Sequence, residues 1–569
     1  MNPYRLIRIL NAPPVAEPLI HARIDSARMR LLAVIAVFSL AFCVIGLRLV
    51  DLAVLKHDRT VHNVGVTAVN KPIKVRRDIV DRNGNLLATT LNTASVFADP
   101  LFVRHPEETA RKLVSVLPGL AYGEALRKLQ GSGRFAYIAR DVSPKRQYAV
   151  NALGLTGIDF IEEERRVYPT RELFSHIIGY TDIDNHGLAG IEYSFDTLLS
   201  EPGAPLRLSL NMALQYALRD EIAGVMDHFR AKAANGLIMD ARSGELLAMV
   251  SLPDFDPHHP ADADKLQRFN RNTLGVYEMG STFKILNAAM ALDSGAIDLT
   301  ETVDTTDPIH VGGFTIDDFF GKHRPLTLPE IIMYSSNIGS TRVAMRAGKD
   351  TQRDFMKRAG LLDPSQVELP EVGAPIVPSP WRDINTMTIA FGHGLAVSPL
   401  QMASAITAVI NGGILHSPSL VKRPEDTPPE GIAIISPQTS LIVRKLMRIA
   451  VTRGTGHNAD VSGFFIGGKT GTSNKVVAGC YDNDFRLASF VGAFPMDDPQ
   501  YVVLAMVDEP QGTDATGGWA TGGWVAAPLV GRMIARMSPI VGAWPRDPTA
   551  PAIVNTLSLV SEGVHLASD

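Results

Sequence analysis

The 569-residue sequence contains only two cysteines, Cys43 and Cys480. Cys43 lies in a stretch that we predict below to cross a membrane, so no internal disulfide is expected. Net charge is also nearly absent, at -4 for pH 7, which gives no reason to expect a nucleic-acid partner. With 46% hydrophobic and 20% charged residues, the chain has the composition of a globular protein of two or more domains.

Residues 31–47 contain no charged residue, whereas the preceding thirty residues are rich in arginine. A basic flank before an apolar stretch is typical of a membrane helix with a cytoplasmic N-terminus. We predict a transmembrane helix at residues 31–52, residues 1–30 in the cytoplasm and the rest outside the membrane. A cleaved signal peptide is the alternative, but no small-x-small cleavage site follows promptly and thirty residues is long for its basic region.

Ser281 and Lys284 are three residues apart, so a helix would place them on one face. Serine is a weak nucleophile by itself, and a neutral lysine beside it could remove its proton. The same spacing recurs at Ser419 and Lys422, but a proline-rich segment follows there and cannot continue a helix. Ser281 instead precedes strong helix formers at 285–292, so we expect only Ser281 to be a nucleophile.

Two further motifs follow in the chain, Ser335-Ser336-Asn337 and Lys469-Thr470-Gly471-Thr472. A free lysine is charged at neutral pH, so Lys284 would have to be buried or lie beside another cation such as Lys469. The Ser335 hydroxyl could relay a proton, and the Asn337 amide could bind a peptide-like substrate. Thr472 and Lys469 could meet a carboxylate, and the backbone N–H groups of Ser281 and Thr472 could form an oxyanion hole.

The hydrophobic pattern changes near residue 206. Before it, residues 60–205 predict a mixed module with a turn at 81–84, helices near 107–117 and 144–153, and ion pairs among Arg76, Arg77, Arg165, Arg166 and Glu192. After it we expect an α+β domain: a five-stranded antiparallel sheet flanked by helices, with a helical insertion at about 285–455. The predicted strands are 234–240, 245–252, 464–473, 487–494 and 501–507, and the flanking helices are 212–226 and 528–537.

This ordered set of motifs resembles the class B penicillin-binding proteins, which are peptidoglycan D,D-transpeptidases; Ser-x-x-Lys, Ser-x-Asn and Lys-Thr-Gly form the signature of penicillin-binding proteins. Further matches are Gly187-x-x-Gly190-x-Glu192 and Gly392-His393-Gly394. Ser335-Ser336-Asn337 followed by Ile338-Gly339 is similar to the division-specific members. The resemblance implies a membrane anchor, a non-catalytic elongated pedestal at 53–205, a transpeptidase domain at 206–545 and a tail at 546–569.

The resemblance also implies a function. Stem peptides ending in D-Ala-D-Ala would acylate Ser281, an amine of a neighbouring strand would then attack, and β-lactams would inhibit covalently. It implies a bacterial inner-membrane protein with a periplasmic catalytic domain, and a SEDS-type glycosyltransferase and other membrane division proteins as partners. No cofactor or metal is expected. The implied catalytic residues are Ser281, Lys284, Ser335, Asn337 and Lys469, and the implied substrate-binding residues are Thr470, Gly471 and Thr472.

Four other functions fit parts of the pattern. An elongation-specific transpeptidase shares the motifs, and a D,D-carboxypeptidase differs only in using water as the acceptor. A class A β-lactamase would need a deacylating glutamate in a Glu-x-x-x-Asn setting, which neither Glu368 nor Glu371 has. A membrane-tethered scaffold or β-lactam sensor with a pseudo-active site is the non-enzymatic alternative. A metal enzyme fits poorly, because His258-His259 lacks a recognised ligand spacing.

Overall fold

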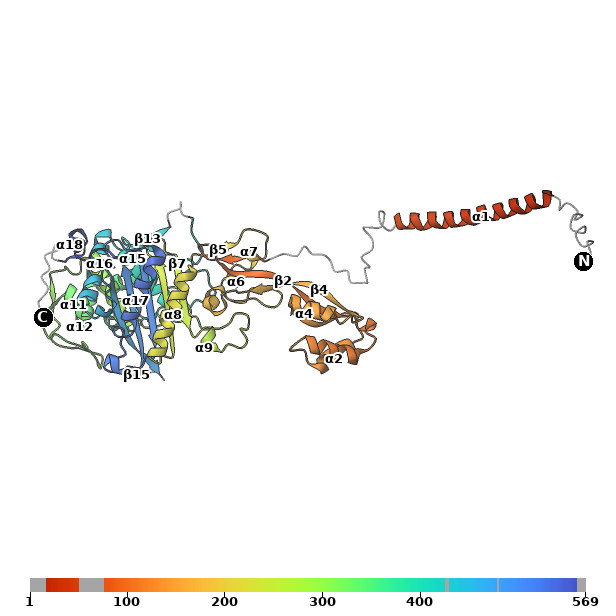
Figure 1. Cartoon of the computed structure of the whole chain (residues 1–569). Helices are drawn as coiled ribbons and strands as arrows, with labels where there is room; N and C mark the ends of the chain where they lie inside the picture. The colour runs from red at the N-terminus through yellow and green to blue at the C-terminus, as the bar shows by residue number, and fades with distance from the viewer. Residues whose placement is uncertain (1–16, 51–75, 425–428, 478–479, 560–569) are drawn as a thin grey trace, which may run out of the picture. The chain divides into compact units, whose positions relative to one another are not determined.

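The computed structural model describes residues 17–50, 76–424, 429–477 and 480–559, and it divides into two units, residues 1–73 and 74–569 (Figure 1). In the first unit, α1 (Glu17–Val50) is a helix whose apolar side chains between Leu32 and Leu47 are exposed. Among the residues that the structure describes, no helix is both long and apolar enough to cross a membrane. Residues 51 and 52 of the predicted membrane helix lie outside the described residues.

The second unit begins with a mixed pedestal module. Its sheet has the order β3-β2-β1-β5, and β4 also pairs with β2. The predicted turn at 81–84 and the helices near 107–117 and 144–153 are confirmed. The strands are β1 (Ile79–Val80), β2 (Leu86–Ala98), β3 (Ala136–Val142), β4 (Ile158–Val167) and β5 (Leu206–Arg207), and the helices are η2 (Pro100–Phe102), α2 (Pro106–Val116), α3 (Tyr122–Leu129), α4 (Pro144–Asn151), η3 (Arg171–Phe174), α5 (Ser175–Ile178), α6 (Gly190–Ser194) and α7 (Asp196–Leu199).

A buried ion cluster holds the pedestal together. Glu192 has no exposed surface, and its two carboxylate oxygens accept hydrogen bonds from Arg76 Nε at 2.7 Å and Arg166 Nε at 2.6 Å. Arg76 also contacts Asp196 at 2.7 Å. A buried carboxylate is costly unless it is paired, so the two guanidinium groups fix α6 against β4 and the start of β1. The predicted pairing of Arg76 and Arg166 with Glu192 is confirmed. Arg77 instead donates to the backbone oxygens of Glu201 and Pro202.

The sheet of the predicted α+β domain is confirmed as five antiparallel strands in the order β14-β15-β16-β6-β7. Three predicted boundaries are wrong. The strand expected at 464–473 begins at Gly467, because Phe465 has a φ of 52° and turns the chain, and it continues to Val477. The strand expected from 487 begins at Cys480, because the polar sequence at 482–484 does not look like a strand. The strands are β6 (Ala233–Asp240), β7 (Leu246–Leu252), β14 (Gly467–Val477), β15 (Cys480–Phe494) and β16 (Tyr501–Asp508).

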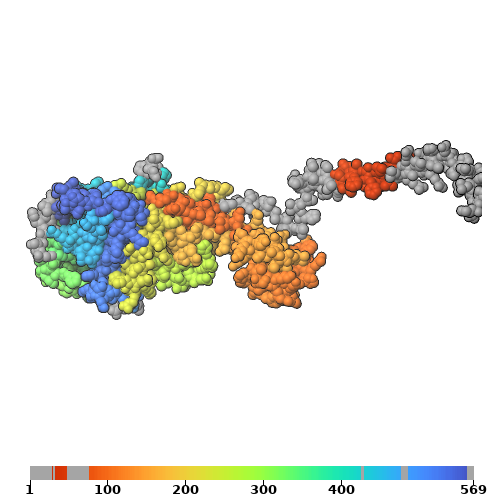
Figure 2. Space-filling model, in the orientation of Figure 1, coloured from red at the N-terminus to blue at the C-terminus, as the bar shows by residue number. Residues whose placement is uncertain are grey.

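Helices cover both faces of this sheet. Alternate residues of β16 point to opposite faces, so Val503 and Ala505 pack with α8 (Met212–His228) and α17 (Ala526–Val541), whereas Leu504 packs with the insertion helices. Figure 2 shows α8 in yellow and α17 in blue side by side. The predicted helices 212–226 and 528–537 are therefore confirmed.

The insertion is helical as predicted and also contains short strands that the sequence did not predict. Its helices α10, α15 and α16 pack beneath the sheet, and α18 of the tail contacts α16. The remaining elements are α9 (Lys265–Arg268), η4 (Gly280–Thr282), α10 (Phe283–Asp293), β8 (Thr302–Val303), β9 (Ile309–Val311), β10 (Phe314–Ile316), β11 (Leu326–Thr327), α11 (Leu328–Tyr334), α12 (Asn337–Ala347), α13 (Lys349–Arg358), α14 (Asp383–Ile389), α15 (Pro399–Ile410), β12 (Ile414–His416), β13 (Gly431–Ala433), α16 (Pro437–Thr452), η5 (His457–Ala459), η6 (Asp514–Thr516) and α18 (Pro551–Leu557).

Candidate active site

Ser281 lies in the single 3-10 turn η4, which leads directly into α10. The preceding Gly280 has a φ of +56°, and a Cβ atom there would lie 2.9 Å from the backbone oxygen of Thr472. Only glycine allows this approach, which packs the start of the Ser281 turn against β14. Ser281 is half-buried and lines a cavity. The nucleophile predicted from sequence therefore begins a helix and faces open space.

Lys284 is 1% exposed, in the first turn of α10. Its Nζ atom donates to the backbone oxygen of Ser335, to Ser335 Oγ at 3.1 Å and to Asn337 Oδ1 at 2.7 Å. Burial holds the pKa of Lys284 well below its usual value, the positive charge of Lys469 lowers that pKa further, and Asp318 opposes both effects. Burial is therefore the main cause of the lowered pKa that a general base requires here, and the neighbouring cation is the second.

The second motif occupies the turn between α11 and α12. Ser335 ends α11 with φ 59° and ψ 43°, a left-handed conformation that is rare outside glycine and asparagine. Ser336 is the N-cap of α12, and its Oγ accepts a hydrogen bond from Gly339 N at 2.9 Å. This sharp turn places both Ser335 and Asn337 against Lys284.

Lys469 reaches the same hydroxyl from β14. Its Nζ atom donates to Ser335 Oγ at 2.9 Å and to Thr455 Oγ1 at 3.4 Å. Lys469 has no exposed surface, and burial lowers its pKa to about 7. Ser335 Oγ thus lies between two buried amines, each of which loses its proton more readily than a lysine in water.

The remaining motif residues lie on β14, the edge strand of the sheet. Thr470 Oγ1 is 2.8 Å from Thr455 Oγ1, and Thr472 Oγ1 accepts a hydrogen bond from Gly522 N at 3.1 Å. A Cβ atom on Gly471 would lie 2.6 Å from the backbone oxygen of Met279. The glycine therefore lets the segment before Ser281 pack closely on the strand.

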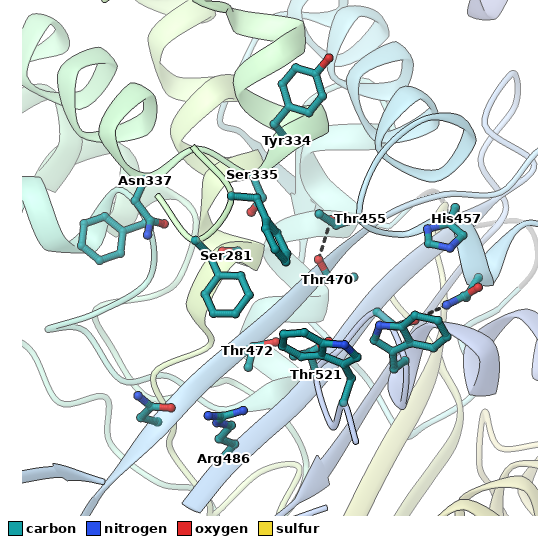
Figure 3. Close-up of a pocket in the computed structure, with 18 of the residues that line it drawn as sticks. Ser281, Tyr334, Ser335, Asn337, Thr455, His457, Thr470, Thr472, Arg486 and Thr521 are labelled. Atoms are coloured by element: carbon teal, nitrogen blue, oxygen red, sulfur yellow. Dashed lines mark hydrogen bonds between the residues drawn. The ribbon is translucent and has the colours of Figure 1, made fainter. Parts of the chain in front are cut away.

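These residues surround a cavity of about 680 Å³ (Figure 3). Of the eight predicted site residues, Ser281, Ser335, Asn337, Thr470 and Thr472 line this cavity. Lys284 and Lys469 lie behind Ser335, and Gly471 packs against Met279. All three motifs therefore meet at one place. None of the residues lining the described cavity is an aspartate or a glutamate.

Several residues of the cavity wall were not predicted from the sequence. Phe319 and Phe320 follow β10, and their rings lie 6.1 and 6.5 Å from the ring of Trp519 on the loop before α17. Such loop residues have no periodic pattern, so only a structure could bring them together. The sequence offers one weak indication that Thr455 lies in a closely packed loop, namely the glycine on each side of it after α16.

Two other candidates prove to be structural. Ser419, the serine of the second Ser-x-x-Lys match, is buried and donates to Glu368 Oε1 at 2.6 Å. His258 accepts a hydrogen bond from the backbone N–H of Tyr168 at 3.0 Å and lies 2.8 Å from Asp256. His258 therefore connects the catalytic module to the pedestal.

The chain belongs to the penicillin-binding protein transpeptidase family. Residues 236–534 match the penicillin-binding protein transpeptidase domain, and residues 73–200 match the penicillin-binding protein dimerisation domain. The probable peptidoglycan D,D-transpeptidase FtsI of Caulobacter vibrioides is 37% identical over 82% of this chain and 81% of its own. The probable peptidoglycan D,D-transpeptidase PenA of Neisseria gonorrhoeae is 33% identical over 85% of this chain and 87% of its own.

Solved structures agree on the fold. Penicillin-binding protein 3 of Mycobacterium tuberculosis, crystallised with aztreonam, superposes with a TM-score of 0.66 at 24% identity and covers 83% of this chain and 98% of its own. The pedestal therefore corresponds to the dimerisation domain of this family, and the five-stranded sheet with its helices forms the transpeptidase domain.

The lowered pKa of Lys469 makes stability depend on pH. Between pH 7 and about 10.4 the unfolded chain holds a proton on this amine that the folded chain lacks, so the free energy of unfolding should rise by about 1.4 kcal/mol per pH unit. Lys469→Met removes this contribution and should show a shallower rise. Urea unfolding at pH 7, 8 and 9 measures it, with the exposed Lys349→Met as control. Equal slopes in wild type and Lys469→Met would contradict the neutral amine.

Proposed function

We propose that this chain is a peptidoglycan D,D-transpeptidase that cross-links stem peptides through an acyl-serine intermediate during septal cell-wall synthesis. The observation that carries the proposal is the Ser335 hydroxyl, hydrogen-bonded to the buried amines of Lys284 and Lys469 beside Ser281 in one cavity. An amine with a lowered pKa, a relay hydroxyl bonded to it and a nucleophile in the same cavity form an arrangement suited to acyl transfer.

In the first step Ser281 Oγ attacks the carbonyl carbon of the penultimate D-Ala. Lys284 takes the hydroxyl proton. As the C–N bond breaks, Ser335 passes its own proton to the nitrogen of the terminal D-Ala and receives the proton held by Lys284. An acceptor amine then attacks the ester, loses its proton through the same groups, and restores the Ser281 hydroxyl. The described hydrogen bonds of Lys284 Nζ go to Ser335 and Asn337, and contacts to the nucleophile commonly tighten only when substrate is bound.

Substrate binding is assigned to the edge of β14. A peptide could add to this edge as a further strand, with its terminal carboxylate near Lys469 and Thr472. Asn337 would hold the donor amide. The backbone N–H groups of Ser281 and Thr472 belong to segments that touch at Gly280, so both could stabilise the oxyanion.

The alternatives are separated by different observations. A class A β-lactamase requires a deacylating acid, and the residues lining the described cavity include none; Glu368 instead accepts hydrogen bonds from Ser419 and Leu420. A pseudo-active site would not need two buried lysines on one hydroxyl. A D,D-carboxypeptidase and an elongation-specific enzyme share the catalytic groups and are distinguished by the acceptor and the cellular role.

Ser281→Ala should lose covalent labelling by a fluorescent penicillin by at least about 1,000-fold, because the acylated oxygen is gone. Gel fluorescence of the purified full chain measures this. Ser419→Ala, with folding checked by circular dichroism, is the matched control and should be labelled like wild type. Labelling that survives in Ser281→Ala would exclude this serine as the acylated residue.

Depletion of the protein should make cells grow as filaments, because a septal enzyme is needed to divide and not to elongate. Light microscopy of a depletion strain measures this, with complementation by wild type and by Ser281→Ala. Filaments should disappear only with wild type. Round, swollen cells without filaments would instead indicate an elongation-specific enzyme.

We also propose a single-pass anchor at residues 31–52 in the bacterial inner membrane, with a cytoplasmic N-terminus, a periplasmic catalytic domain and a SEDS-type glycosyltransferase partner. Apolar side chains exposed all round α1, such as Phe38 and Phe42, support a lipid environment for this helix. Deleting residues 31–52 from a chain exported by an added signal peptide should release it into the soluble periplasmic fraction and abolish co-purification with the glycosyltransferase. Wild-type protein in that soluble fraction would contradict the anchor.

A further inference from the structure

Asp318 lies on the loop between β10 and β11, directly before the two phenylalanines of the cavity wall. Its carboxylate accepts three hydrogen bonds from the second motif: from Ser336 Oγ at 2.6 Å, from Asn337 N at 2.5 Å and from Ile338 N at 3.0 Å. The carboxylate therefore caps the 11-residue helix α12 at its positive end.

The same loop fixes the side chain of Asn337. Asn337 Nδ2 donates to the backbone oxygen of Asp317 at 2.8 Å, so Oδ1 is the atom left to face Lys284 Nζ, 2.7 Å away. An amide turned the other way would put two donors against an amine and lose this acceptor. Backbone and side chain of Asn337 are thus both held from one side by residues 317 and 318.

Asp318 also acts on Lys284 through its charge. Lys469 on β14 and Asp318 on the loop are the charged residues that shift the protonation of Lys284, and they act in opposite directions. His393 and His457 line the same cavity, and both are unchanged in a comparison of Asp318 variants.

We propose that Asp318 is a positioning residue for acyl transfer, which holds the Ser335–Asn337 turn against Lys284 and supplies a negative charge that acts on this buried amine. This inference rests on the proposed role of Lys284. The loop then has two roles. Phe319 and Phe320 line the cavity, and the adjacent Asp318 carboxylate binds the loop to the catalytic turn.

Two substitutions separate charge from hydrogen bonding. Asp318→Asn keeps an acceptor oxygen for the backbone N–H groups of α12 and removes the charge, while its NH2 group replaces the oxygen that accepts from Ser336 Oγ. The pKa of Lys284 should fall, so the acidic limb of the pH profile for penicillin acylation should move to lower pH by roughly 0.5 to 1 unit. Asp318→Ala also loses the three hydrogen bonds, and its maximal acylation rate should fall by about tenfold or more.

The experiment is stopped-flow acylation of the full chain by a chromogenic β-lactam between pH 5 and pH 9. Asp307→Asn removes an exposed carboxylate from the same insertion. It should match wild type both in the pH of the acidic limb and in the maximal acylation rate. A limb that stays at the wild-type pH in Asp318→Asn would overturn the role of Asp318 while leaving the proposed function intact. A wild type without any acidic limb would overturn Lys284 as the base, and with it both proposals.

Discussion

The catalytic site depends on one oxygen atom, Ser335 Oγ, which is hydrogen-bonded to two amines that burial has deprived of water. Burying an ammonium ion costs several kcal/mol, and the described hydrogen bonds of both amines go to hydroxyl, amide and carbonyl oxygens rather than to carboxylates. Each amine therefore releases its proton more easily than a lysine in water does. Every element around the site serves this arrangement, because α10, the turn after α11 and strand β14 each bring one part of it.

The pedestal buries charge in the opposite way. In the interior, two arginines share the carboxylate of Glu192, and Asp196 pairs with one of them. Here oppositely charged partners replace much of the lost water, so the ion pairs hold the module together. Among the described residues, the chain thus buries amines without carboxylate partners in the catalytic site, where a proton must move. It buries ion pairs in the pedestal, where the structure must stay fixed.

Much of this could be predicted from sequence. The long strands and helices have clear periods, and the three motifs name every catalytic group that the structure brings together. The strand predicted from 464 began too early, since apolar Phe464 and Phe465 look like strand residues but form a turn. The two- and three-residue strands of the insertion are too short for any period. Asp318, Phe319 and Trp519 act from irregular loops, whose contacts depend on tertiary packing that local sequence does not encode.

The order of strands in the transpeptidase sheet determines when the sheet can be completed during synthesis of the chain. β6 and β7 are made early, while β14 is joined to them only through β15 and β16, which are made last. Lys469 and Thr472 therefore lie in the completed sheet only after residues beyond 500 have been synthesised and have paired. A nascent or truncated chain exposes Ser281 without all the groups that make it reactive. Acylation of Ser281 therefore indicates that the domain is complete.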